Sequence, residues 1–170
     1  VERHDIADAL RQGRVDAVVD IAMPLAAEVH HTRLVLDQLV VVAKANHPVI
    51  QQGPLRLDTY LAASHVLVSA RKQGAVSGRL MRSPRQIGLR CRHYFAACRV
   101  VNQTDMLLTM PEQYAKVANQ LFDNQLHTFP LSPAQLDAHL YWHAGSDEDP
   151  TNQWLRTQLV QAVQQELKAL

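Results

Sequence analysis

Cys91 and His93 are the two residues whose types and spacing come nearest to nucleophilic chemistry in this sequence. A thiolate is a strong nucleophile, and the flanking Arg90 and Arg92 would lower the pKa of the Cys91 thiol. A nucleophilic centre also needs a base that a third group orients, and no such group stands near this pair in the sequence. We therefore favour a buried structural thiol at Cys91 over a catalytic one.

The nine histidines are the residues that would suggest a metal site. His30 and His31 are adjacent, so on a strand they would point to opposite faces. His139 and His143, four residues apart, would be direct neighbours only on a helix, whereas their segment has the pattern of a strand. No His-Glu-x-x-His motif is present. The spacing therefore predicts surface or edge histidines and no metal site.

The remaining motifs of catalysis and cofactor binding are also missing from the sequence. There is no Gly-Lys-Ser/Thr phosphate loop, no Gly-x-Gly-x-x-Gly after a strand and no Gly-x-Ser-x-Gly elbow. The three acids Asp147-Glu148-Asp149 precede a predicted helix, where negative charge offsets the helix dipole. We therefore predict no enzyme, no catalytic residue and no cofactor.

A segment without acids, between Asp58 and Asp105, carries the main charge signal. Such a segment would favour an anionic ligand, a phosphate or an acidic protein face. The alternative is a solvated basic face, compensated in space by acids elsewhere. With a formal net charge of +1 the whole chain gives no argument for nucleic-acid binding. The basic residues are Arg71, Lys72, Arg79, Arg82, Arg85, Arg90, Arg92 and Arg99.

Length and composition fit an ordinary globular protein. A chain of 170 residues can form one good core or two small lobes. No uninterrupted apolar stretch reaches the ~18–20 residues that a membrane span needs, and residues 1–5 do not resemble a signal peptide. Two cysteines cannot form a disulfide framework. We therefore expect a reducing, cytoplasmic setting.

Short predicted strands alternate with short predicted helices along the chain, which favours an α/β fold with mostly parallel strands. The apolar run 15–21 is expected to be a buried strand. Thr104 or Asp105 is expected to cap a helical turn. Helices are predicted at 5–11 and 57–63. A third predicted helix begins at Pro111, with Tyr114, Val117, Ala118 and Leu121 on one face, and a fourth begins at 149–150 and buries Trp154. The other predicted strands are 34–43, 65–68, 88–93, 99–101, 126–129 and 138–143.

The order of these elements does not fit a single doubly wound sheet. Residues 46–130 carry their own set of short elements between two breaks, Asn46-His47-Pro48 and Phe129-Pro130. This pattern predicts one lobe inserted into another, with the chain crossing twice between them. Such an architecture would form a cleft.

Several short motifs also follow one another in order, and together they cover nearly the whole chain. They are Leu10-x-x-Gly13-x-x-Asp16, 39–42 leading to His47-Pro48, 65–69, Thr104-Asp105 before Pro111, 129–131, Trp142-His143, Asp149-Pro150 and 154–156. Each motif alone is weak, but the ordered set resembles the effector-binding domain of LysR-type transcriptional regulators. It resembles in particular the subgroup of nodulation and aromatic-degradation activators.

The resemblance implies a two-subdomain fold like that of type 2 periplasmic binding proteins, with a ligand cleft and two hinge crossovers. Subdomain I would comprise 1–45 and 131–170, without its first strand and helix, which in the family precede Val1. Subdomain II would comprise 46–130. The implied protein is a cytoplasmic homo-oligomer that senses a small-molecule effector, such as an aromatic acid or another anion. It would bind DNA only through an N-terminal helix-turn-helix outside this sequence, and no membrane.

In two-lobed sheets of this kind, ligands bind at the carboxyl ends of strands and at helix N-termini. The polar side chains at these places suit a carboxylate or a phenol, although Ser69 and Thr104 could instead cap backbone N–H groups. The predicted ligand-binding residues are Ala22, Met23 and Pro24 after the first strand, Ser69 and Gln73 after the 65–68 strand, and Asn102 and Thr104 ahead of the next helix.

Two other classes of function stay open at this point. A solute-binding protein of the same architecture would carry an export signal upstream, where a regulator would carry a helix-turn-helix. An enzyme on this fold would need a catalytic group that the sequence does not offer. For the regulator we also expect self-association.

Overall fold

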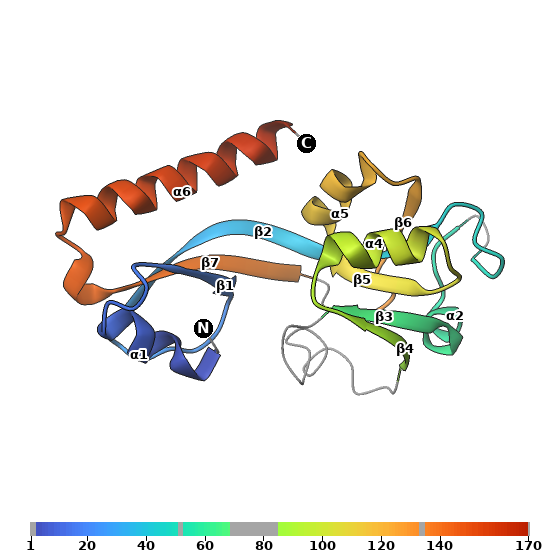
Figure 1. Ribbon diagram of the computed structural model, residues 1–170, viewed down its shortest axis with the longest axis horizontal. Coiled ribbons are helices and arrows are strands. Elements are labelled where there is room, and N and C mark those ends of the chain that lie inside the picture. The colour runs from blue at the N-terminus through green and yellow to red at the C-terminus, as the bar shows by residue number, and fades with distance from the viewer. Residues whose placement is uncertain (1–2, 51–52, 69–84, 133–134, 170) are drawn as a thin grey trace. The chain divides into compact units, whose positions relative to one another are not determined.

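The computed structural model describes residues 3–50, 53–68, 85–132 and 135–169 (Figure 1). It divides into two compact units, unit 1 with residues 1–37 and 136–170 and unit 2 with residues 38–135. Both units combine helices and strands, so the predicted α/β class is confirmed. The expectation of mostly parallel strands is wrong, because antiparallel pairings outnumber parallel ones among the described strands. The predicted inserted subdomain, 46–130, lies inside unit 2.

Unit 1 is a small antiparallel sheet with one helix packed on it. Strand β1 (Val18–Ile21) pairs with β7 (Gln135–His143), and β7 lies next to the first part of β2 (Val29–Lys44). Helix α1 (Ile6–Arg11) buries Ile6 and Leu10 against the sheet. The unit also contains the turns η1 (Arg3–Asp5) and η2 (Ala144–Ser146) and the helix α6 (Pro150–Ala169).

Helix α1 forms and ends where the sequence predicts. Its N-terminal residue follows Asp5, and the chain turns at Gly13, whose φ of 62° is the left-handed conformation that glycine tolerates. The amide of Gly13 donates to the carbonyl of Leu10, which closes the last turn. Residues 12–17 then connect the helix to β1.

Strand β1 differs from its prediction. It is antiparallel to β7, and Val19 is 56% exposed, so it is not a buried parallel strand. Val18, on the other face, packs against the α1 core. An apolar run therefore signals burial on one face here and not on both.

Unit 2 is a mixed sheet with helices on both faces. Strand β3 (Ser64–Val68) is parallel to β4 (Gln86–Cys91) and to β5 (Leu107–Pro111), and β2 is antiparallel to β5 and to β6 (Asn124–Thr128). Helices α4 (Tyr94–Asn102) and α5 (Glu112–Asn119) cover one face. Helix α2 (Leu57–Ala62) places Tyr60 against the other.

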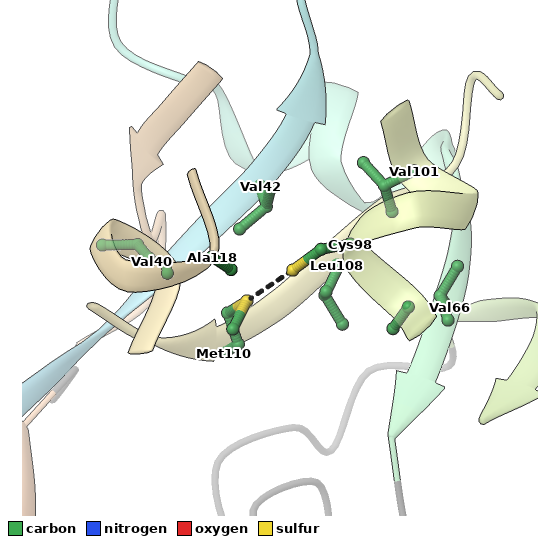
Figure 2. Close-up of a cluster of buried hydrophobic side chains, with 10 residues drawn as sticks. Val40, Val42, Val66, Cys98, Val101, Leu108, Met110 and Ala118 are labelled. Carbon is green, nitrogen blue, oxygen red and sulfur yellow. Dashed lines mark hydrogen bonds between the residues drawn. The ribbon is translucent and has the colours of Figure 1, made fainter. Parts of the chain in front are cut away.

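Figure 2 shows the core between α4, α5 and the sheet. The side chains come from every third or fourth residue of α4 and from alternate residues of the strands, as the two periodicities require. The Cys98 thiol donates a 3.6 Å hydrogen bond to the sulfur of Met110. The buried members are Val40, Val42, Val66, Ala97, Cys98, Val101, Leu108, Met110, Ala115 and Ala118.

The region after β4 is where the predicted elements fail. Residues 99–101 belong to helix α4 and not to a strand, because Ala97, Cys98 and Val101 form one buried helical face. Residues Thr104 and Asp105 precede strand β5 and not a helical turn.

Two predicted helix faces are also wrong. Helix α5 begins after Pro111 as expected, but Ala115 and Ala118 are buried while Tyr114, Val117 and Leu121 are exposed. On α6, Trp154 is 63% exposed. The small residues allow α5 to approach the sheet closely, which leaves the larger side chains outside.

No helix in the described part of the chain is both long and apolar enough to cross a membrane.

Candidate functional site

The corner after β1 holds three of the predicted ligand-binding residues. Ala22 and Pro24 are exposed and Met23 is half-buried. The amide of Ala22 donates to the Asp137 carbonyl over 2.7 Å. The amide of Met23 donates to the Tyr141 hydroxyl over 3.2 Å, and that hydroxyl donates to the Ile21 carbonyl over 3.3 Å.

Tyr141 is the residue that fixes this corner. Its side chain is 1% exposed and packs in the α1 core, so its hydroxyl has a defined position. Two bonds from one hydroxyl to successive parts of the corner hold the backbone while leaving the side chains of Ala22 and Pro24 outside. The corner can therefore present a preorganised surface to a ligand.

The turn between α4 and β5 holds Asn102 and Thr104, and both side chains are engaged there. The Thr104 hydroxyl donates to the Val100 carbonyl over 3.0 Å and accepts from the Met106 amide over 3.3 Å. The Asn102 amide group donates to Oδ1 of Asn124 over 3.3 Å. These are the bonds of the local-cap alternative, and the strand that follows replaces the expected helix.

The other two predicted residues, Ser69 and Gln73, lie outside the described residues. Strand β3 ends at Val68, where the sequence places its carboxyl end. The ligand-binding role of both residues stays a prediction.

A partly buried polar group under the unit 2 sheet was not predicted from the sequence. The hydroxyls of Tyr60 and Thr109 are 2.7 Å apart, and Nη1 of Arg85 donates to the Tyr60 hydroxyl over 3.3 Å. Tyr60 is 0% exposed and packs edge-on against Phe129. A guanidinium and two hydroxyls thus meet at one place, which is a donor set suited to an oxyanion.

His65 lies beside this group as a neutral imidazole. Its Nε2 donates to the Tyr60 carbonyl over 2.7 Å, and its ring packs edge-on against the Tyr60 ring. Burial, with a smaller contribution from the nearby Arg85 charge, lowers the pKa of His65 to about 4. The position of Tyr60 within a short amphipathic helix gave no signal that its hydroxyl would meet Thr109, since that contact joins residues far apart in sequence.

The cysteines show no nucleophilic arrangement. Strand β4 ends at Cys91, and His93 stands at the start of α4, so the two residues do not share a strand. Cys98 lies in the core, where burial raises the pKa of its thiol to about 11. A thiol with that pKa stays protonated at neutral pH.

Comparison with known proteins connects these features to a family. Residues 1–164 match the family described as LysR substrate binding domain. The chain is 27% identical to the HTH-type transcriptional regulator LinR of Sphingobium indicum, over 89% of this chain and 52% of that protein. It therefore spans about half the length of that curated relative.

Solved structures of transcriptional regulators have a similar fold. A probable transcriptional regulator from Pseudomonas aeruginosa is 26% identical with a TM-score of 0.80, over 89% of this chain and 52% of that chain. The regulatory domain of MexT, a transcriptional activator in Pseudomonas aeruginosa, is 22% identical with a TM-score of 0.71, over 91% of this chain and 75% of that chain.

Proposed function

Because the chain belongs to the LysR substrate binding domain family, we propose that it senses an anionic small molecule through polar groups at the strand ends of its two units. The chain is an effector-sensing regulatory domain with the α/β fold of periplasmic binding proteins, as the resemblance implied. The alternative of a solute-binding protein is not favoured, since the matched relatives are transcriptional regulators.

The proposal of an anionic effector rests on the position of the Arg85 guanidinium. It reaches the paired hydroxyls of Tyr60 and Thr109. A planar guanidinium with adjacent hydroxyl donors binds carboxylates and phenolates in a fixed orientation. The surrounding segment between Asp58 and Asp105 contains no acid, which favours an anion further. We propose an aromatic acid as the class of effector.

The proposal also includes the residues that the sequence predicts to bind ligand at the ends of strands. In unit 1 the corner Ala22–Pro24 would supply backbone and thioether contacts on the frame that Tyr141 holds. In unit 2 Ser69 and Gln73 would supply side-chain donors after β3. Asn102 and Thr104 would act through their effect on the α4–β5 turn, since their own polar groups are bonded within it.

Titration calorimetry with benzoate, salicylate and the neutral benzamide tests the anionic effector. We expect a carboxylate to bind and benzamide to bind at least tenfold more weakly. The substitution Arg85→Gln should cost about 1.5–3 kcal/mol of binding free energy, the range for a hydrogen bond to a charged group. Arg56→Gln is the matched control, because Arg56 is exposed and pairs with Asp58. Equal binding of acid and amide would contradict the proposal.

A second copy of the chain is the partner that we propose for helix α5. Its outer face presents Tyr114 and Val117, and Leu121 follows in the turn after the helix; these side chains are 44%, 43% and 71% exposed. Phe95 of α4, 49% exposed, lies against Phe122 beside them. A contiguous apolar stripe of this kind is typical of a protein interface. Leu121→Lys should shift sedimentation toward the monomer, and an unchanged self-association would exclude this face.

The wider setting follows the family. We propose that the chain is part of a longer cytoplasmic regulator that binds DNA through a helix-turn-helix, and that it has no catalytic role. DNA binding by the longer protein at a promoter whose expression responds to the effector is the observation that would test this.

A further inference from the structure

Two histidines from distant parts of the sequence meet on the sheet of unit 1. His31 on β2 and His139 on β7 hold their Nδ1 atoms 2.9 Å apart, and their ring centroids are 4.9 Å apart. His31 is exposed and His139 is half-buried, so solvent reaches the pair. The spacing along the chain could not reveal this contact, because it joins residues 108 positions apart.

Tyr141 supports both rings. Its ring centroid lies 5.6 Å from that of His31 and 5.9 Å from that of His139, with which it is stacked. The tyrosine is buried and its hydroxyl is bonded on both sides. The two imidazoles therefore rest on a fixed aromatic base, which reduces the entropy lost when a ligand orders them.

The chemistry of the contact depends on one proton. Two facing Nδ1 atoms can share a single proton, with one nitrogen donating and the other accepting. A metal ion can replace that proton and use both lone pairs.

Carboxylates flank the pair on the same face of the sheet. Asp20 of β1 is the direct cross-strand partner of His139, and directly paired residues lie on one face. Asp137 precedes His139 by two residues, so it also lies on this face. Its Oδ1 is buried without a hydrogen-bond partner among the described residues, with Arg33 4.0 Å away as an opposing cation.

We propose that His31 and His139 bind a divalent transition-metal ion of the Ni²⁺, Cu²⁺ and Zn²⁺ group through their Nδ1 atoms. Imidazole ligands favour these ions over Mg²⁺ and Ca²⁺, which prefer oxygen. Within the described residues no three metal-ligating side chains converge on one point. Water therefore completes the coordination, and the two carboxylates offset the charge of the ion.

Zn²⁺ is the probe for the test, because it is redox-inert and leaves the two thiols unoxidised. Zn²⁺ is titrated into the metal-free chain in competition with a chromophoric chelator. The ring nitrogens are followed by ¹⁵N NMR in the same samples. We expect one equivalent of Zn²⁺ to bind and the Nδ1 resonances of His31 and His139 to move, while Mg²⁺ has no effect.

Substitutions then locate the site. His31→Ala and His139→Ala should each weaken Zn²⁺ binding roughly tenfold or more. His30→Ala is the matched control, because His30 neighbours His31 on the same strand but pairs with Asp147 over 2.8 Å. It should bind Zn²⁺ as the unsubstituted chain does.

Three results would overturn the proposal: no measurable binding of Zn²⁺, binding that survives both substitutions, or movement of other histidine resonances in the unsubstituted chain. The NMR experiment needs no substitution, so a variant that fails to fold does not remove the test. None of these results depends on the effector.

Discussion

Strand β2 is one continuous element whose two halves lie in different units and are buried to very different extents. Residues 39–43 are all buried, because β5 and β6 flank this half and α4 and α5 cover it. Residues 30–33 are all exposed. The second half stabilises the fold, whereas the first half places His31 beside His139 in reach of solvent. One strand thus serves packing in unit 2 and ligand contact in unit 1.

Two leucines on β2 allow the sharpest test of this difference. Leu39 is 3% exposed and Leu36 is 52% exposed. We expect Leu39→Ala to lower the free energy of unfolding by about 2–5 kcal/mol, because it removes buried methyl groups and leaves a cavity. Leu36→Ala should change it by less than about 0.5 kcal/mol. Urea unfolding measures both, and equal losses would show that the two halves are buried alike in solution.

The buried His65 of unit 2 should make the free energy of unfolding depend on pH. His65 of unit 2 is fully buried, and burial lowers its pKa to about 4 from the usual 6.5. The unfolded chain therefore takes up a proton between pH 6.5 and 4 that the folded chain does not, so stability falls as the pH falls through this range. The expected loss is about 2–3 kcal/mol.

His65→Gln isolates this effect, since glutamine does not titrate. Its unfolding free energy should fall less than that of the unsubstituted chain between pH 6.5 and 4, when both are measured by urea unfolding. An identical pH dependence in the two proteins would mean that the buried imidazole is not its cause.

The regular elements were predictable where local pattern and burial agree. Helix α2 and strands β3 and β7 occur where the sequence places them, because their apolar residues recur at the spacing of the observed element. Residues 99–101 look like a strand by their β-branched valines, but packing of Ala97 and Val101 against the sheet makes them helical. Tertiary contacts overrode local propensity there.

The candidate site was predictable only in its backbone positions. The corner after β1 follows from the rule on strand ends, and Ala22–Pro24 do lie there. The contacts of Tyr60 with Thr109 and of His31 with His139 join separate elements, so no spacing within one segment could indicate them. Residues that meet only through sheet pairing are beyond the reach of periodicity in one sequence.

The smallest expected difference between the two units is in the unfolding free energy lost when one tyrosine hydroxyl is removed from each. The Tyr60 hydroxyl meets Thr109 and Arg85 under the unit 2 sheet, and the Tyr141 hydroxyl bonds the β1 corner in unit 1. Tyr60→Phe leaves a partner hydroxyl and a guanidinium next to a ring edge, and should lower the unfolding free energy by about 1–3 kcal/mol.

Tyr141→Phe should lower the unfolding free energy by about 0.5–1.5 kcal/mol, because water at the exposed corner can replace the lost hydroxyl for the Met23 amide. Its ring would still support His31 and His139, so Zn²⁺ binding should persist. Urea unfolding and the zinc titration together measure both effects. A larger loss for Tyr141→Phe than for Tyr60→Phe would mean that the β1 corner, and not the polar group under the unit 2 sheet, is the more strongly desolvated of the two places.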